Sequence, residues 1–353
     1  MCNLFCRGRK VNQIVSELRK DGDDLSRFNV HAIIREAAQS GHFRYNPPQH
    51  LRLSVKISQR ADLAGNVSVV HSIEQEAVAI EAAARIFELI NGPPMQRLRN
   101  KLGSKDGELH IGFAGGRILQ NTARLLAEKL KTAPRGFGRQ ICLHALVASF
   151  GDPLANPNSF LGYFAPRKDL PRAPRMVGLP APGFIHAETV EMLRQVEGIR
   201  DSYEEIENLD LIITSGGAHW NNTKPCSYLH ELHKKFGNFQ QLNAAGCVGD
   251  IAWRPVSAAG PIELDQGYRA MTLIELSAFP KLIASGTRIM VVLGPCGGCG
   301  GPKDELLNCL LSWDRKHVTD LVLDSGTAAA LERRWDSASS ATAVAPAPIL
   351  SPI

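Results

Sequence analysis

Residues 109–130 read LHIGFAGGRILQNTARLLAEKL and contain the pattern that decides the fold. The apolar run Leu109–Phe113 predicts a buried strand, and the glycines after it predict a tight loop. From Ile118 onward the apolar residues recur at the spacing of a helix that buries one face. Strand, glycine loop and helix follow one another in this order again further along the chain, which predicts a doubly wound parallel α/β sheet.

Other apolar runs extend the same pattern on both sides of this stretch. The further strands that they predict are Ile141–Val147, Leu209–Thr214, Arg288–Leu293 and Leu321–Asp324. An alanine-rich stretch, Glu76–Ile90, predicts a helix, and residues 61–82 are expected to form a connector that leads into it. The three last strands each run into glycine, as Ser215-Gly216-Gly217, Gly294–Lys303 and Ser325-Gly326.

Charge is distributed unevenly along the 353 residues. Residues 1–60 hold eleven Lys and Arg against five Asp and Glu, a net charge of +6, whereas the rest of the chain carries −1. This asymmetry is typical of a nucleic-acid-binding head on a neutral body, although a solvated basic face would produce it too. The expected organisation is a head at 1–60, an effector domain at 61–335 and a disordered tail at 336–353, rich in Ser, Ala and Pro.

Two helical patterns open the chain. Apolar residues recur at helical spacing in Val11–Leu18 and again in Val30–Ala37, and Ser26 is a plausible N-cap for the second helix. Residues 42–45 suggest a short extended arm, so the outline is that of a winged helix-turn-helix. Two amphipathic helices also occur in many domains that do not bind DNA. If this head does bind DNA, the polar side of its second helix places three side chains to reach the major groove, Arg27, His31 and Arg35.

Cysteine and hydropathy patterns bear on location and metal content. The N-terminus lacks the apolar segment of a secretory signal, and no apolar run approaches the length of a membrane span, so we expect a cytoplasmic protein without a membrane partner. Cys296 and Cys299 form a C-x-x-C that suggests a tight loop. A zinc site completed by Cys2 and Cys6 or by His230 and His233, or a thiol switch, are the alternatives. We expect no metal and no cofactor.

The glycine loops are the candidate ligand site. Ligands of open parallel sheets bind at the carboxyl ends of the strands, where glycine lets backbone N–H groups approach. Arg117 and Lys303 each stand at a helix start, where the positive end of the helix dipole also attracts an anion. Asp250 and Asn156 could hold hydroxyl groups. A Walker A loop is excluded because Pro302 precedes Lys303 and Asp304 replaces the hydroxyl residue, and no catalytic signature is present.

Several segments occur together in an order that belongs to one family. They are IGFAGGR (111–117), NPNSFLG (156–162), LPAPGFIHAETVEMLR (179–194), LDLIITSGG (209–217), AAGCVGDIAWR (244–254), GGPK (300–303) and LVLDSGTAAAL (321–331). From about residue 73 to residue 334, the chain therefore resembles the sugar-binding effector domain of SorC-type transcription regulators. SRFNVHAIIREAAQSG (26–41) is similar, more loosely, to the recognition-helix region of that family.

The resemblance implies a fold related to sugar-phosphate isomerases, glucosamine-phosphate deaminases and CoA transferases. It implies a DNA-binding regulator that responds to a sugar or sugar phosphate and assembles as a homo-oligomer, a dimer or tetramer. The ligand residues that it implies are Gly115, Gly116, Arg117, Asn156, Ser215, Gly216, Gly217, Asp250, Arg254 and Lys303. The alternatives are an enzyme on the same fold, with Asp250 or Lys303 as acid or base, and a binding protein whose head mediates oligomer contacts.

Three departures from the family pattern affect the identity of the ligand. Ile118 stands where the family usually has a threonine, so a phosphate-binding hydroxyl is lost. Trp253–Ser257 replaces a Gly-Arg-Phe-Phe-Asp pattern, and the CGGC stretch at 296–299 is unusual. The fold expectation survives these changes, whereas two alternatives stay open for the site: a different sugar, or loss of ligand binding.

Overall fold

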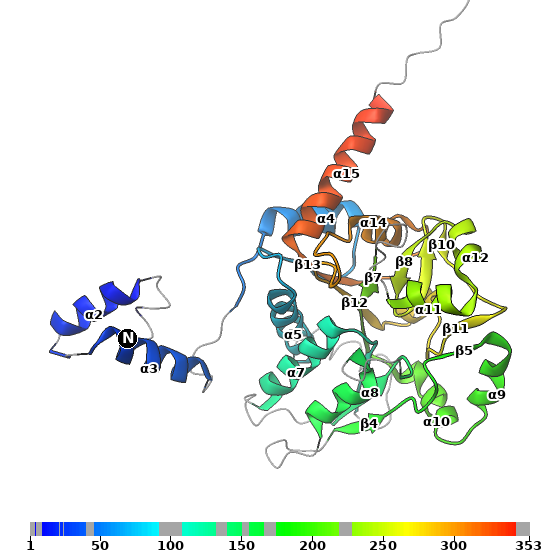
Figure 1. Ribbon diagram of the computed structural model, residues 1–353, viewed down its shortest axis with the longest axis horizontal. Coiled ribbons are helices and arrows are strands. Elements are labelled where there is room, and N and C mark those ends of the chain that lie inside the picture. The colour runs from blue at the N-terminus through cyan, green and yellow to red at the C-terminus, as the bar shows by residue number, and fades with distance from the viewer. Residues whose placement is uncertain are drawn as a thin grey trace, which may run out of the picture. The chain divides into compact units, whose positions relative to one another are not determined.

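A computed structural model describes Leu4 and residues 9–20, 22–23, 25–39, 46–91, 108–131, 140–149, 155–165, 174–218 and 228–343 (Figure 1). The chain divides into two compact units, Met1–Asn46 and Pro47–Ile353. No helix among these described residues is both long and apolar enough to cross a membrane.

The first unit contains the two helices that the sequence predicted, α2 (Val11–Lys20) and α3 (Arg27–Gln39). Their apolar faces meet in a small core of Ile14, Val15, Leu18 and Val30. The Ser26 hydroxyl accepts a hydrogen bond of 3.2 Å from the Asn29 N–H, which is the N-cap expected before α3. The predicted arm at 42–45 lies outside the described residues.

A parallel sheet forms the centre of the second unit. Among the described residues it has seven strands in the order β1-β13-β12-β6-β2-β3-β4, and every pairing is parallel. The strands are β1 (Val67–Val70), β2 (Leu109–Phe113), β3 (Ile141–Ala145), β4 (Arg175–Val177), β6 (Leu211–Thr214), β12 (Arg288–Leu293) and β13 (Asp320–Asp324). The α/β fold class predicted from the glycine-loop pattern is therefore confirmed, and β1 and β4 are strands that the sequence analysis missed.

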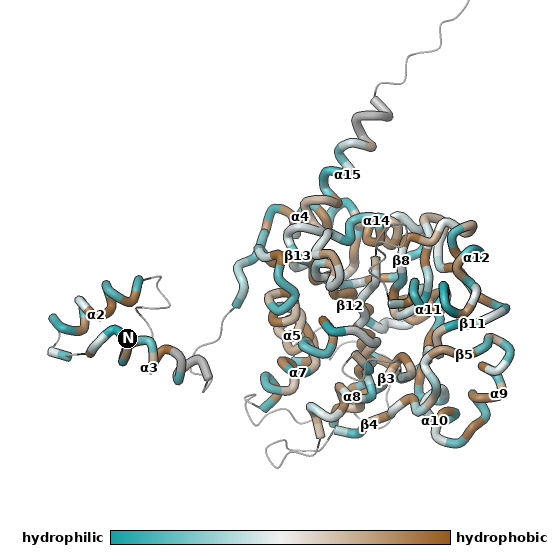
Figure 2. The backbone as a smooth tube through the Cα atoms, viewed as in Figure 1, coloured by the Kyte–Doolittle hydropathy of each residue, from teal (hydrophilic) through white to brown (hydrophobic). Residues whose placement is uncertain are grey.

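Helices cover the sheet, as parallel strands require. The longer ones are α4 (Leu51–Ala61), α5 (Gln75–Asn91), α7 (Arg117–Lys131), α14 (Asp304–Ser312) and α15 (Ser325–Ala343). Helices α5 and α7 pack against each other and against β12. In Figure 2 apolar residues gather on the central strands, whereas α11 (Tyr228–Phe236) and α12 (Phe239–Ala244) carry hydrophilic residues.

Shorter elements surround this core. Two small antiparallel sheets have the orders β10-β9-β8-β7 and β11-β5. Their strands are β5 (Phe184–His186), β7 (Gly216–Gly217), β8 (Cys247–Ile251), β9 (Arg254–Ser257), β10 (Gly260–Pro261) and β11 (Tyr268–Ala270). The remaining helices are α8 (Pro157–Phe160), α9 (Val190–Arg194), α10 (Ile199–Glu204) and α13 (Phe279–Ala284), with 3-10 turns at Leu161–Phe164, Ala187–Thr189, Ile206–Asn208 and Leu276–Ala278.

The unit boundary lies before the position expected from charge. Helix α4, predicted as part of the head at 1–60, packs on β1 and α15 and buries Leu53 and Ile57 in the main core. Arg52 and Lys56 form ion pairs with Glu332 of α15. These basic residues therefore belong to the second unit, and the head at 1–46 keeps eight Lys and Arg against five acids.

The end of the chain also departs from its prediction. Residues 336–353 were expected to be disordered because the stretch from Ser337 onward lacks charge and contains proline. Helix α15 instead continues to Ala343, and residues 344–353 lie outside the described part. Alanine is the strongest helix former, which favours extension of a helix that is already anchored on the core.

A fragment that begins at Pro47 should keep the stability of the second unit, whereas one that begins at Asp62 should lose much of it. The shorter fragment lacks Leu53 and Ile57, which are 1% and 0% exposed, and burial of each contributes about 1.5–3 kcal/mol. Thermal unfolding of residues 47–353 and 62–353 measures the difference. Equal midpoints would contradict the assignment of α4 to this unit.

The α4–α15 ion pairs should make stability depend on acid. Hydrogen bonds from Arg52 and Lys56 lower the pKa of Glu332 to about 2 in the folded chain. The stabilisation is complete above the unfolded pKa of about 4.3 and is lost as the pH falls toward 2. In urea unfolding at a series of pH values, Glu332→Gln should lower stability at pH 7 and flatten the fall between pH 5 and 2. If the wild type and Glu332→Gln lost stability with the same slope between pH 5 and 2, the result would count against this pairing.

Candidate functional site

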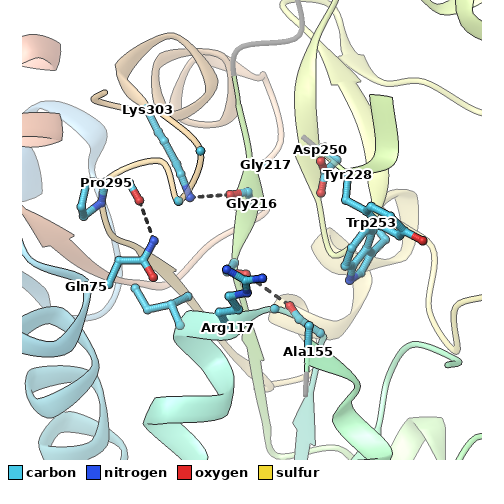
Figure 3. A pocket seen from close by; sticks show the side chains of 16 residues that line it. Gln75, Arg117, Ala155, Gly216, Gly217, Tyr228, Asp250, Trp253, Pro295 and Lys303 are labelled. Atoms are coloured by element: carbon cyan, nitrogen blue, oxygen red, sulfur yellow. Dashed lines mark hydrogen bonds between the residues drawn. The ribbon is translucent and has the colours of Figure 1, made fainter. Parts of the chain in front are cut away.

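A cavity of about 650 Å³ opens where β2, β6 and β12 end. Its walls come from the loops that follow these strands and from the β7–β8 region. The lining residues are Gln75, Gly115, Gly116, Arg117, Ile118, Ala155, Ser215, Gly216, Gly217, Tyr228, Asp250, Trp253, Pro295, Gly297, Gly298 and Lys303. Figure 3 shows Gln75 and Lys303 on one side, Asp250, Tyr228 and Trp253 on the other, and Arg117 between them.

Three helix N-termini border this cavity. Gln75 is the first residue of α5, Arg117 is the first of α7, and Lys303 is the N-cap of α14. Each N-terminus carries N–H groups without intrahelical partners and the positive end of a helix dipole. Together with the Arg117 and Lys303 charges, they make this part of the cavity favourable for an anion.

Lys303 is held in place by the backbone around it. Its side chain is buried, its ammonium group donates to the Gly216 carbonyl at 2.8 Å, and its N–H donates to the Thr327 hydroxyl at 3.2 Å. Burial lowers the pKa of Lys303, and nearby acidic groups, Asp250 among them, oppose that shift. Arg117 is exposed by contrast, so the two cations differ in their contact with solvent.

Glycine is required where the cavity walls approach one another. A Cβ on Gly216 would lie 2.6 Å from the Asp250 carbonyl oxygen, and one on Gly249 would lie 2.2 Å from the Gly217 carbonyl oxygen. A Cβ on Gly115 would lie 2.7 Å from the Trp253 indole nitrogen. A side chain at Gly216 or Gly249 would push β7 and β8 apart, and one at Gly115 would displace the Trp253 indole.

Trp253 enters the cavity on a constrained turn. The two residues between β8 and β9, Ala252 and Trp253, have φ angles of 50° and 65°, which favour glycine or asparagine. Non-glycine residues in this region cost of order 1–3 kcal/mol each and persist where the surrounding structure holds them. Tyr228 contacts the indole edge-on with ring centroids 5.9 Å apart, so two aromatic rings form one wall.

The structure brings most of the sequence-predicted ligand residues to one place. The cavity contains Gly115, Gly116, Arg117, Ser215, Gly216, Gly217, Asp250 and Lys303. Asn156 and Arg254 do not line it. Asn156 instead caps α8, accepting from the Asn158 N–H at 3.0 Å, and the buried Arg254 guanidinium pairs with Glu275.

Several lining residues were missed by sequence reasoning. Trp253 and Ile118 had been treated only as departures from a family pattern, and Gln75 and Tyr228 had not been considered. The Gln75 amide donates to the Pro295 carbonyl at 3.0 Å and so fixes the loop before Gly297. Gln75 reaches the cavity because it is the first residue of α5, and no local sequence pattern indicates that position.

The CGGC stretch forms the tight loop that was the first expectation for it. The Gly300 N–H donates to the Cys296 carbonyl at 2.8 Å, and the Cys296 N–H donates to the Gly301 carbonyl at 2.9 Å. Cys296 is buried and Cys299 is exposed. A zinc site at this loop would need Cys2 and Cys6, or His230 and His233. Cys2 and Cys6 lie outside the described residues, and His230 and His233 do not cluster with Cys296.

A second polar cluster lies away from this cavity. His110, Cys142, His144 and Glu205 offer ligand atoms that all lie within 4.8 Å of one another. Burial raises the pKa of Cys142 to about 12 and lowers that of His144 to about 4, so both side chains are neutral at pH 7 in the metal-free chain. The sequence analysis singled out none of the four.

In the first unit, α3 presents the expected polar face. Arg27 and His31 are exposed one turn apart on this helix, and the side chain of Arg35 lies outside the described part. Phe28 is also exposed, at 81%.

No family model and no curated protein matches the sequence, whereas solved structures match the fold. The full-length sorbitol operon regulator SorC from Klebsiella pneumoniae is 16% identical, with a TM-score of 0.59 over 93% of this chain and 95% of that chain. A transcriptional regulator from Streptococcus pneumoniae TIGR4 is 14% identical, with a TM-score of 0.58 over 81% and 97% of the two chains.

A domain of a possible sugar-binding transcriptional regulator from Arthrobacter aurescens TC1 is 18% identical, with a TM-score of 0.56 over 80% of this chain and 96% of that chain. At these identities the likeness concerns the fold. The chain therefore has the fold of SorC-type transcriptional regulators, as its ordered sequence motifs predicted.

Proposed function

We propose that this protein is a DNA-binding transcription regulator that responds to a sugar phosphate bound in the cavity of the second unit. The observation that carries the proposal is the convergence of Arg117, Lys303 and three helix N-termini on one cavity. Its volume of about 650 Å³ lies within the range of small-molecule sites.

The polarity of the cavity suggests how such a ligand is oriented. The phosphate would lie between Arg117 and Lys303, where an Arg fork and a Lys point charge both suit it. Asp250, on the opposite side in Figure 3, is placed to accept hydrogen bonds from sugar hydroxyls. The apolar faces of Trp253 and Tyr228 would contact the C–H groups of the sugar ring.

Ile118 bears on the identity of the ligand. It lines the cavity at the position where the resemblance implies a threonine, so its side chain offers no hydroxyl to a phosphate. Binding of the anion then depends more on Arg117 and on backbone N–H groups at the start of α7. We therefore expect a ligand that differs from those of regulators with the threonine.

The comparisons support the regulatory role. The matched proteins are described as a sorbitol operon regulator and as a possible sugar-binding transcriptional regulator. The 93% coverage by the Klebsiella protein exceeds the share of the chain in residues 47–353, so that match includes part of the head. Arg27, His31 and Arg35 are the proposed DNA contacts, and a homo-oligomer acting in the cytoplasm is the form that we propose.

The proposed ligand class is tested by thermal unfolding with hexose phosphates, pentose phosphates, the free sugars and inorganic phosphate. A sugar phosphate at a hundred times its Kd should stabilise the wild type by about 2.7 kcal/mol. Arg117→Gln and Lys303→Met should lose the shift because they remove the charges that hold the anion. Arg124→Gln, on the exposed side of the same helix, and Lys281→Met are the matched controls.

Two outcomes would count against this assignment. Equal shifts in Arg117→Gln and Arg124→Gln would place the anion elsewhere. Turnover of a sugar phosphate that is abolished by Asp250→Asn would instead show an enzyme on the same fold, the alternative that Asp250 in the cavity keeps open.

DNA binding by the head should depend steeply on salt. For each phosphate contact, the decimal logarithm of the affinity falls by about 0.9 when the salt concentration rises tenfold. Arg27→Ala and His31→Ala should each weaken binding to fragments selected from genomic DNA, and Arg27→Ala should reduce the slope if Arg27 contacts a phosphate. Fluorescence anisotropy over a salt series, with Lys281→Ala as control, gives both quantities. Salt-independent DNA binding would refute this role. So would a protein that binds no DNA and whose oligomer is lost when residues 1–46 are removed.

A further inference from the structure

The register of two parallel strands, β2 and β3, brings three metal-binding side chains together, and a fourth comes from the segment after α10. His110 of β2 lies directly opposite Cys142 of β3, and Cys142 lies opposite Arg175 of β4. His144 is two residues beyond Cys142 and so points to the same face of the sheet. Glu205, which follows α10, completes the group from that face.

The ligand atoms lie within 4.8 Å of one another, close to the spacing of a tetrahedral zinc site. The distance is 2.9 Å from His110 Nδ1 to His144 Nε2, 3.3 Å from Cys142 Sγ to His144 Nε2, and 3.7 Å from His110 Nδ1 to a Glu205 carboxylate oxygen. Zinc bonds of about 2.0–2.3 Å in tetrahedral geometry place neighbouring ligand atoms roughly 3.3–3.8 Å apart. The two histidine nitrogens, at 2.9 Å, are closer than this, so their rings must rotate apart to admit the ion.

Hydrogen bonding alone leaves the cluster incompletely satisfied. His144 Nε2 has a single site for a hydrogen bond in the ring plane, yet both His110 Nδ1 and Cys142 Sγ approach it. His144 is fully buried, and its Nδ1 has no partner among the described residues. A metal ion between the three ligands would replace this competition by three separate bonds.

The surrounding charges balance a divalent cation. Arg175 binds both Glu108 and Glu205, with its nearest contacts at 2.9 and 2.6 Å. Two carboxylates and a Cys142 thiolate carry three negative charges, which Arg175 and a divalent ion together neutralise. Glu108 also lies 3.7 Å from His110 Nε2, the ring nitrogen that faces away from the site, an arrangement that orients metal-binding histidines.

We propose that His110, Cys142, His144 and Glu205 bind a zinc ion at the amino ends of β2 and β3. The ligand set of sulfur, two imidazoles and a carboxylate suits zinc. Glu205 and Arg175 are partly exposed, at 25% and 37%, so the ion can enter from that edge. The proposed site lies near the start of β2 and the cavity lies beyond the end of β2, so either can exist without the other.

The test uses the full-length protein after removal of metals with a chelator. Zinc is titrated in competition with a chromophoric chelator, and cobalt is then added to the metal-free protein as a spectroscopic probe. We expect one zinc per chain and a cobalt spectrum with the charge-transfer band of a single thiolate ligand and the intense visible bands of tetrahedral geometry. Zinc should also raise the thermal unfolding midpoint.

Variants assign the site. Cys142→Ser should weaken zinc affinity more than about 100-fold and abolish the thiolate band, and Glu108→Gln should weaken it about 10-fold through His110. Cys309→Ser, at another buried cysteine, should change neither. Should Cys142→Ser fail to fold, Glu205→Gln at the exposed edge provides the same test with an expected loss of at least 10-fold.

Three results would overturn the proposal. The first is absence of a zinc complex tighter than micromolar in the wild type. The second is a cobalt spectrum with two thiolate ligands, which would place the metal at Cys296 and Cys299. The third is equal affinity in the wild type and in a folded Cys142→Ser variant.

Discussion

The binding cavity depends on the contact between Lys303 and the backbone of β7. The ammonium group binds the Gly216 carbonyl, and the glycines at 216 and 249 let β7 lie against β8 at a distance that no side chain would allow. That approach brings Asp250 and the Trp253 turn opposite Arg117. A buried lysine is costly unless it is paired, so the same interaction that stabilises Lys303 also fixes the shape of the wall.

The central strands could be predicted because their burial leaves a continuous apolar signal. The runs at Leu109–Phe113 and Arg288–Leu293 became β2 and β12, since strands covered on both faces need apolar residues at nearly every position. β1 and β4 are short and lie beside polar segments, so periodicity does not reveal them. The basic residues of α4 were assigned to the head because sequence does not show that Glu332, far along the chain, neutralises two of them.

Local sequence likewise reveals part of the cavity but not the cluster around Cys142. Arg117 and Lys303 could be found because a cation after a glycine loop is a local signal with a physical meaning. Trp253 could not, because its position depends on a turn with positive φ that its own residue type disfavours. The group around Cys142 depends on which strands pair and in which register, and neither property is written in the local sequence.

Helix α15 contacts both the cavity and helix α4. Its first turn holds Thr327, which accepts the hydrogen bond from the Lys303 N–H, and five residues later Glu332 binds Arg52 and Lys56 of α4. α4 follows almost directly after Asn46, where the chain leaves the first unit. A single helix therefore contacts both the Lys303 side of the cavity and α4, the helix that lies nearest in sequence to the first unit.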